Sequence, residues 1–277
     1  MIVTSMNLSE YNFQRCKLCG EMTAEPLYDL TDGIIYSCRH CDFHFLNRLD
    51  SQSEKNQTST PLNDKTRRYI ELRLNESAHL HPARIQLTQE YIKLHSINTL
   101  DIGAGLGQFQ LLLKAAGVNG EGIEPSGIRR EYAREKFNID LQEKLVDDPY
   151  WQLNFRNHFD LITLWDVIEH VDFPRETLQA AIKLLKPGGF LFLETPSRDV
   201  LSYKASQLLY RLCSGKTSLF LPNFYSTGRY GHKQIFTHEQ ITDLLKRLGL
   251  EIICSKHSYP TRLLRGDKMI LIARKTR

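Results

Sequence analysis

Along most of the chain, short segments with few charged residues alternate with longer segments in which apolar residues recur every three or four positions. The short segments predict strands at 99–102, 120–124, 159–165 and 190–194. The segment at 99–102, directly before a group of glycines, predicts a buried strand. Apolar positions three or four residues apart predict helices between them, at 109–114, 128–137 and 174–185. This alternation is typical of an α/β fold with a doubly wound, mostly parallel sheet.

Further segments extend the same sheet at both ends of this region. A third strand is expected over 139–146, and strands at 250–255 and 268–273 are expected to form an antiparallel terminal pair. The complete sheet would then have seven strands. Helices are expected in 64–95, before the first strand, and an insertion at 197–231 follows the fifth strand. Aromatic and basic residues of this insertion could form a substrate pocket or a lid.

The tightest predicted turn follows the first strand, where Asp101 precedes three glycines at alternate positions, Gly103, Gly105 and Gly107. Glycines let the backbone turn sharply beside a ligand, and the helix N-terminus that follows offers unpaired N–H groups. A dinucleotide fingerprint needs its third glycine at position 108, which here is Gln108. Glu124 ends the second strand, about 20 residues on, where a carboxylate can accept both ribose hydroxyls. The pattern therefore predicts a nucleoside-bearing cofactor and disfavours a nicotinamide dinucleotide.

Two pairs of cysteines near the N-terminus have the spacing of a four-thiolate metal site. They are Cys16 and Cys19, followed by Cys38 and Cys41. A segment this small has too little hydrophobic core to fold without a metal ion or a disulfide, and four thiolates complete a tetrahedral zinc site. We therefore expect a structural zinc ion, with redox-active cysteine pairs as the alternative. His40 and His44 are close enough to substitute as ligands, but the cysteines suffice.

These patterns divide the chain into three expected parts. Residues 1–47 would form a zinc ribbon, the polar stretch 48–63 a linker or mobile lid, and residues 64–277 the α/β domain. Composition is that of a globular protein, with a formal net charge of +4 spread along the 277 residues. No apolar stretch approaches the roughly 20 residues of a membrane span, and the N-terminus lacks the blocks of a signal peptide. We expect a cytoplasmic protein, and the sequence does not determine its oligomeric state. It carries no strong indication of nucleic-acid binding.

The acid and three glycines at 101–107 resemble the first motif of class I S-adenosylmethionine (SAM)-dependent methyltransferases. The resemblance covers roughly residues 97–197 and continues more weakly to the C-terminus. The segments FDLITLWDVIEHV (159–171) and LLKPGGFLFLETP (184–196) look like the ubiquinone-biosynthesis O-methyltransferase-like branch. The cysteine ribbon is similar to that of bacterial methyltransferases with an N-terminal zinc-binding module, some of which methylate sugar carbons of nucleotide-linked deoxysugars.

The resemblance implies a Rossmann-like methyltransferase domain that transfers a methyl group from SAM to a hydroxyl or carbon of a small-molecule or carrier-linked metabolite. It implies that Asp101 orders the glycine turn near the methionine amino end and that Glu124 holds the ribose. Trp165 and Asp166, at the end of the fourth strand, complete the expected cofactor site together with the three glycines. The acid that receives the adenine amino group stays open among Asp140, Glu143, Asp147 and Asp148.

Three residues are candidates for catalysis. Methyl transfer is an in-line displacement, so a base is needed only if the acceptor must lose a proton. His170 follows the fourth strand at the carboxyl edge of the sheet, and a histidine there can take a hydroxyl proton near neutrality. Glu169 beside it could pair with it, or the two could hold a divalent metal that acidifies a phenol or enol. His232 is the other candidate, and for all three a purely structural role stays open.

Two other classes of function compete with a small-molecule methyltransferase. An oxidoreductase would need a dinucleotide site, against which Gln108 and the leading Asp101 argue. An RNA methyltransferase, or a non-catalytic module that binds SAM or nucleic acid, would use the ribbon to bind nucleic acid. The ribbon carries acidic residues as well as basic ones and so is not a basic surface, with Glu21, Glu25, Asp29, Asp32 and Asp42 against Arg15, Lys17 and Arg39.

Overall fold

The computed structural model describes residues 11–30, 33–50, 62–77, 79–118, 120–213, 221–226, 231–258 and 267–276. The chain forms two compact units, each of which combines segments that are distant in sequence. Unit 1 comprises Met1–Glu54, Asp166–Leu178 and Glu194–Leu271, and unit 2 comprises Lys55–Trp165, Gln179–Leu193 and Ile272–Arg277. Each core is therefore completed by several chain segments rather than by one continuous stretch.

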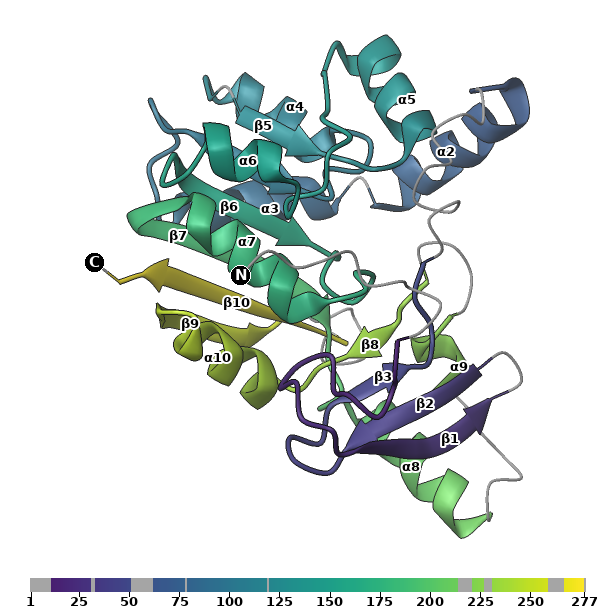
Figure 1. The fold of residues 1–277 in the computed structure, drawn as a ribbon. Helices are drawn as coiled ribbons and strands as arrows, with labels where there is room; N and C mark the ends of the chain where they lie inside the picture. Colours follow the sequence, from purple (N-terminus) through teal and green to yellow (C-terminus); the bar gives the residue numbers. More distant parts are fainter. Residues whose placement is uncertain are drawn as a thin grey trace. The chain divides into compact units, whose positions relative to one another are not determined.

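Unit 2 contains the parallel strands at the start of the α/β sheet (Figure 1). Strand β4 (Thr99–Ile102) pairs in parallel with β5 (Gly120–Ile123) on one side and with β6 (Phe159–Trp165) on the other. Every residue of β4 is buried, as predicted, and this includes the polar Thr99 and Asp101. The next strands of the sheet are β7 (Leu185–Pro196), β10 (Lys268–Lys275) and β9 (Leu250–His257), in the order β5-β4-β6-β7-β10-β9. The doubly wound, mostly parallel α/β sheet is thus confirmed.

The described part of this sheet has six strands where seven were predicted. The expected third strand at 139–146 is reduced to one parallel bridge between Ile123 and Gln142. The backbone of Gln142 donates to Gly122 O and accepts from Glu124 N, at 2.8 and 2.9 Å. The chain then turns to Asp148, whose side chain caps α6 (Pro149–Asn154) by accepting from Tyr150 N at 2.8 Å. Turn and cap residues end the pairing after a single bridge.

Helices flank these strands at the predicted places. In unit 2 they are α2 (Asp64–Ser77), α3 (Leu80–Gln89), α4 (Gln108–Ala115), α5 (Gly127–Phe137) and α6, while α7 (Pro174–Leu184) contains residues of both units. Helix α4 starts directly after Gly107, and α5 ends at Phe137 and is followed by Asn138, which adopts the left-handed conformation common after a helix. The expected helices within 64–95 are α2 and α3.

The cysteine-bearing part of unit 1 forms its own antiparallel sheet. Strand β1 (Ala24–Leu30) pairs with β2 (Gly33–Cys38), which pairs with β3 (His44–Leu46). A fourth strand, β8 (Gln234–Ile235), comes from far along the chain and pairs antiparallel with β3 (Figure 1). Phe43 stacks on Phe45 of β3 and contacts Phe236, and all three rings are buried. The sheet of the ribbon is therefore completed by a strand that no local sequence pattern predicted.

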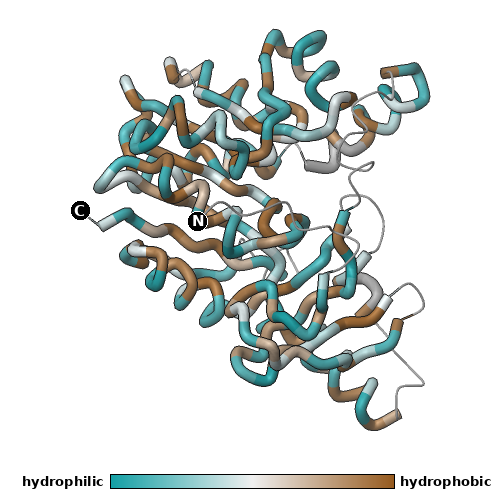
Figure 2. The backbone as a smooth tube through the Cα atoms, viewed as in Figure 1, coloured by the Kyte–Doolittle hydropathy of each residue, from teal (hydrophilic) through white to brown (hydrophobic). Residues whose placement is uncertain are grey.

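The remaining helices of unit 1 are α8 (Leu201–Leu212), α9 (Leu221–Phe224) and α10 (His238–Arg247). Thr237 caps α10 in a reciprocal capping box with Gln240. In Figure 2 strand β10 is hydrophobic along most of its length, in line with its burial. Of the predicted insertion at 197–231, residues 214–220 and 227–230 lie outside the described residues, as does 51–61 of the predicted linker. Within the described ranges, no helix has the length and hydropathy of a membrane span.

Candidate functional site

The glycine turn of unit 2 has the backbone that its sequence predicted. Gly103, Gly105 and Gly107 have φ angles of +73°, +58° and +75°, a region that side-chain-bearing residues rarely adopt. A Cβ at Gly105 would meet nothing within 4 Å, whereas one at Gly107 would lie 3.3 Å from Ile139. Position 107 therefore favours glycine both for its backbone conformation and because a side chain there would crowd Ile139. Gly105 faces open space, where a ligand can approach the backbone closely.

The carboxylate of Glu124 holds this turn in place. It is buried, and its Oε2 accepts a hydrogen bond from Gly105 N at 2.9 Å, while Oε1 accepts from Ser126 N at 2.8 Å. The guanidinium of Arg129 lies 3.7 Å from Oε2. Burial raises the pKa of Glu124, and Arg129 with the two N–H groups opposes that rise. The two candidate cofactor residues Gly105 and Glu124, distant in sequence, are thus joined directly.

Asp101 is buried on β4, between β5 and β6. Its Oδ1 accepts a 2.6 Å hydrogen bond from the hydroxyl of Thr163 on β6. Burial raises the pKa of Asp101 to about 7, and the bond from Thr163 lowers it. A carboxyl group in this state would ionise more readily beside a cation such as the ammonium or sulfonium of SAM.

Trp165 ends β6 in a buried position. Its ring lies 5.5 Å from Phe109 and 5.1 Å from the guanidinium of Arg84, measured to the ring centroid. The indole Nε1 is buried and has no hydrogen-bond partner in the described structure. A buried donor of this kind usually has a partner, so the unpaired indole fits a ligand that accepts a hydrogen bond there.

A second group of predicted residues lies in unit 1. Glu169, His170 and His232 offer one carboxylate oxygen and two imidazole nitrogens that all lie within 4.8 Å of one another. His170 Nδ1 is 3.1 Å from Gly231 O, and its Nε2 is 3.9 Å from Glu169 Oε1. The His170 and His232 rings are 4.8 Å apart. A carbonyl oxygen can only accept a hydrogen bond, so Nδ1 of His170 carries the proton of the neutral ring. Its Nε2 therefore presents a lone pair toward Glu169 and His232.

The electrostatics of this group follow from its burial. Burial, and then the proximity of His232, lowers the pKa of His170 to about 4. Burial also lowers the pKa of His232, against a hydrogen bond to the backbone of Phe224. Burial, and then the neighbouring Asp166 carboxylate, raises the pKa of Glu169 to about 8. Glu169 Oε2 accepts from Thr195 Oγ1 at 2.8 Å, while Oε1 is buried with no hydrogen-bond partner in the described structure.

Asp166 begins the segment that leads to Glu169. Its φ is +58°, and its backbone N–H donates to Glu194 O at 2.9 Å. The ammonium of Lys268 lies 2.7 Å from the Asp166 carboxylate and 3.6 Å from that of Glu194. This ion pair fixes the candidate cofactor residue Asp166 within unit 1.

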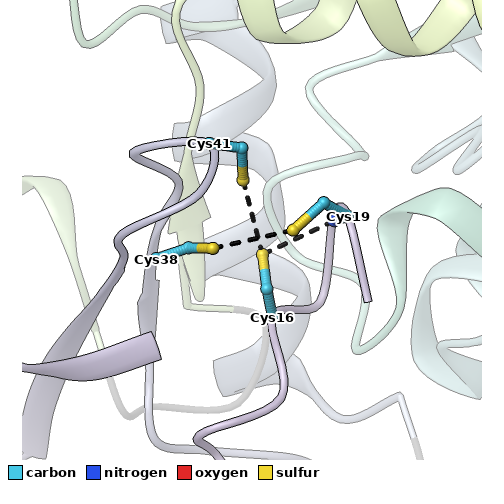
Figure 3. A group of neighbouring side chains, drawn as sticks. All are labelled: Cys16, Cys19, Cys38 and Cys41. Atoms are coloured by element: carbon cyan, nitrogen blue, oxygen red, sulfur yellow. Dashed lines mark hydrogen bonds between the residues drawn. The ribbon is translucent and has the colours of Figure 1, made fainter. Parts of the chain in front are cut away.

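The four predicted metal-binding cysteines converge within unit 1 (Figure 3). The Sγ atoms of Cys16 and Cys41 are 3.6 Å apart, as are those of Cys19 and Cys38. A tetrahedral zinc site with Zn–S bonds of about 2.3 Å has sulfur atoms about 3.8 Å apart. The backbone N–H groups of Leu18 and Cys19 also point at Cys16 Sγ, at 3.4 and 3.5 Å, and would stabilise a thiolate. The donor set and its geometry fit zinc.

The structure adds partners that the sequence pattern does not single out. Thr163 bonds to Asp101 from the neighbouring strand β6, Lys268 pairs with Asp166 from the last strand, and Gln234 supports the Glu169 segment from β8. All three are pairings between distant segments, so no local spacing marks them. Only the inward position of Thr163 on a buried strand gives a weak signal.

Comparisons with known proteins agree with this architecture. The family model described as "Methyltransferase domain" matches residues 64–255. Among curated relatives, "Ubiquinone biosynthesis O-methyltransferase" of Marinobacter nauticus is 24% identical over 178 residues, covering 62% of this chain and 71% of the relative. The protein of the same name from Colwellia psychrerythraea is 26% identical over 195 residues, covering 63% and 73%. A solved SAM-dependent methyltransferase of Thermotoga maritima has a TM-score of 0.53 at 19% identity, over 76% of this chain and 97% of its own.

The fold and the glycine turn define a class I, Rossmann-like methyltransferase. The chain belongs to the methyltransferase-domain family, whose model spans more than half of it. It is a SAM-dependent methyltransferase, as the sequence motifs predicted.

Proposed function

We propose that this methyltransferase acts on a hydroxyl group of a small-molecule or carrier-linked metabolite, with His170 as the base. The observation that carries the proposal is the orientation of the His170 ring, whose Nδ1 is bound to Gly231 O and whose Nε2 lone pair faces Glu169 and His232. The curated relatives, named for O-methylation in ubiquinone biosynthesis, support a hydroxyl over a carbon acceptor. Methylation of carbon stays the alternative within this class.

SAM, when bound, supplies a methyl group that is electrophilic because it is attached to a sulfonium. The residues proposed to hold it are Asp101, Gly103, Gly105, Gly107, Glu124, Trp165 and Asp166. In unit 2 the open face of Gly105 and the unpaired indole of Trp165 support this assignment. Asp101 would face the cationic methionine end and Glu124 the ribose hydroxyls.

His170 would accept the proton that the acceptor hydroxyl loses as its oxygen bonds to the methyl carbon. Its pKa is lowered to about 4, so the ring is uncharged at neutral pH and in the form that accepts a proton, while the same shift makes it a weaker base than an exposed histidine. The Glu169 carboxyl lies 3.9 Å from Nε2. Its pKa is raised to about 8, so it is mostly protonated at neutral pH, and it would ionise more readily beside the imidazolium that forms and so stabilise it. His232 lies against the ring and would share in orienting the hydroxyl.

A second candidate role for the same three residues is to hold a divalent cation. The observation that favours it is the convergence of one carboxylate and two imidazoles, with Glu169 Oε1 buried and lacking a hydrogen-bond partner in the described structure. A cation there would lower the pKa of an acceptor hydroxyl as a Lewis acid. Loss of activity with a chelator, restored by Mg²⁺ or Mn²⁺ but not by Zn²⁺, would distinguish this role from the ribbon metal.

We further propose that Cys16, Cys19, Cys38 and Cys41 hold a structural zinc ion, since all four ligand positions would be filled by thiolates. The boundaries 1–47 for the ribbon, 48–63 for the linker and 64–277 for the methyltransferase domain stay predictions. So does a cytoplasmic location.

The acceptor class is tested by transfer of labelled methyl from SAM into host extract, separated into small-molecule, lipid, polysaccharide, protein and RNA fractions. Label in a small-molecule, lipid or polysaccharide fraction that disappears with Asp101→Ala supports the proposal. Label in RNA alone would instead establish the RNA methyltransferase alternative. Cofactor binding with no label in any fraction would point to a non-catalytic binding module.

A further inference from the structure

The segment Gly231–Ile235 makes backbone contacts in two directions within unit 1. On one side Lys233 N donates to Glu169 O at 2.8 Å, and Gly231 O accepts from His170. On the other side Leu46 N donates to Lys233 O at 2.6 Å, and the strand pairs Phe45 with Gln234 and His44 with Ile235. One short stretch thus joins the ribbon strand β3 to the turn that carries Glu169 and His170.

The side chain of Gln234 strengthens the first of these contacts. It is fully buried, and its Nε2 donates to Ile168 O at 2.8 Å and to Val171 O at 2.7 Å. These two carbonyls flank Glu169 and His170 in the sequence. An amide that donates both of its hydrogens to one turn fixes the backbone of that turn, because each buried carbonyl would otherwise lose its partner.

Lys233 anchors the same stretch through charge. Its buried ammonium lies 2.7 Å from Asp50 Oδ2 and 2.8 Å from Asp172 Oδ1. Asp172 Oδ1 also accepts from Asp50 N at 3.0 Å. A buried lysine held between two carboxylates resists displacement, since moving it would leave unpaired charges in a low-dielectric interior.

The ribbon end of the connection starts at the cysteines. Asp42 N donates to Cys38 O and Cys38 N donates to Phe43 O, at 2.7 and 3.0 Å, so the second cysteine pair fixes the start of β3. Gln240 Nε2, from the first turn of α10, donates to Cys41 O at 2.8 Å. The path from the cysteines to His170 therefore runs through β3 and β8 with no break in hydrogen bonding.

We infer that the cysteine ribbon positions the acceptor-side residues through β8, with Gln234 as a positioning residue that holds Glu169 and His170 in register with His232. The ribbon is then part of the catalytic apparatus rather than an appended module. This inference rests on the proposed role of His170. It predicts that damage to the ribbon or to Gln234 lowers turnover while cofactor binding is kept, because the candidate cofactor residues other than Asp166 belong to unit 2 and Asp166 is held separately by Lys268.

The test compares Gln234→Met with Gln152→Met in the full chain. Methionine keeps the length of glutamine but donates no hydrogen bond. Gln152 provides the control because its Nε2 also donates to a backbone carbonyl, Ala180 O at 3.1 Å, on α7. Two properties are measured, the imidazole NMR signals of His170 and His232, assigned with His→Gln variants, and kcat beside the dissociation constant for SAM.

Gln234→Met is expected to shift both imidazole signals and to lower kcat by about 10- to 100-fold, as for residues that orient a functional group, with SAM affinity unchanged. Gln152→Met should leave all of these properties as in the wild type. Unchanged imidazole signals in a folded Gln234→Met variant would overturn the inference, as would a loss of activity that only follows a loss of SAM binding.

A second measurement applies if Gln234→Met does not fold. Zinc is removed from the wild-type protein with a chelator, in buffer without Mg²⁺ or Mn²⁺ throughout, and is then restored at one equivalent per chain, while the same imidazole signals are followed. A reversible shift supports the inference, and unchanged signals contradict it. Failure of the proposed function is distinguishable, since His170→Gln would then retain kcat while Gln234→Met or zinc removal still shifts the imidazole signals.

Discussion

The hydroxyl of Thr163 donates a 2.6 Å hydrogen bond to Oδ1 of Asp101, joining β6 to β4 in the interior of the sheet. Both residues are buried, and the pKa of Asp101 is nevertheless raised from its ordinary 3.8 to about 7, since the cost of burial exceeds the gain from this bond. The sheet thus holds a carboxyl group that is close to half ionised at neutral pH.

Asp101→Asn is expected to change how stability depends on pH. A carboxyl whose pKa rises on folding binds more protons in the native than in the unfolded state between these two values, so its contribution to stability is lost as pH rises from about 4 to 7. In the absence of SAM, the unfolding free energy of the wild type should fall relative to the variant by up to about 4 kcal/mol over this range. Urea titrations at several pH values measure it. Parallel curves for the two proteins would contradict the assignment, and Thr163→Val, which removes a bond that lowers the pKa of Asp101, should extend the fall to higher pH.

Gly105→Arg should abolish SAM binding without unfolding the protein. The position has a φ of +58° and open space beside it, so a side chain costs about 1–2 kcal/mol of backbone strain and occupies the place proposed for the ligand. Gly117→Arg is the matched control, since Gly117 has a φ of +79° and nothing within 4 Å of a Cβ, but lies between α4 and β5. Calorimetric titration with SAM and thermal melting measure both effects. Equal SAM affinities in the two variants would remove Gly105 from the cofactor site.

Cys16→Ser should release the proposed zinc and lower the melting temperature while SAM affinity stays the same. A serine hydroxyl is a poor ligand for a four-thiolate site, whereas the candidate SAM-binding residues from Asp101 to Trp165 belong to unit 2. Metal analysis should give about one zinc per chain in the wild type and in the control Cys213→Ser, a cysteine outside the cluster. Full zinc content in Cys16→Ser would contradict the ligand assignment.

His170→Gln should lower kcat by about 10²- to 10⁴-fold, the usual contribution of a general base, with SAM binding unchanged. His238→Gln serves as the control because His238 is bound to Asp199, 3.1 Å away, and lies outside the Glu169 group. Steady-state kinetics with the identified acceptor measure the difference. A kcat within the range of the control would leave His170 with a structural role.

The wild-type pH profile offers an independent check on His170. Because its pKa is lowered to about 4, the base form is already dominant at pH 6. Protonation of this ring should therefore reduce kcat only well below pH 6 rather than near the ordinary value of 6.5. An inflection near 6.5 that disappears in His170→Gln would show that the ring is less buried in the working enzyme.

Local patterns were sufficient wherever structure and chemistry depend on neighbouring residues. The strand, glycine turn and helix around Asp101 follow from residue periodicity and glycine conformation, and the cysteine spacing brings four sulfur atoms together. The predicted third strand shows the limit of such patterns. Its residues pair with β5 only at Gln142, because the length of a strand depends on its partner and on the cap that follows.

The sequence by itself determined the class of protein, the cofactor turn and the cysteine cluster, since each depends on the spacing of residues that are close together in the chain. Only the tertiary structure decided that β8 completes the ribbon sheet, that Gln234 holds the turn of Glu169 and His170, and that Lys268 neutralises Asp166. These are contacts between residues far apart in the chain. Their free energy arises from burial and from hydrogen bonds that exist only once the chain has folded, so no local pattern encodes them.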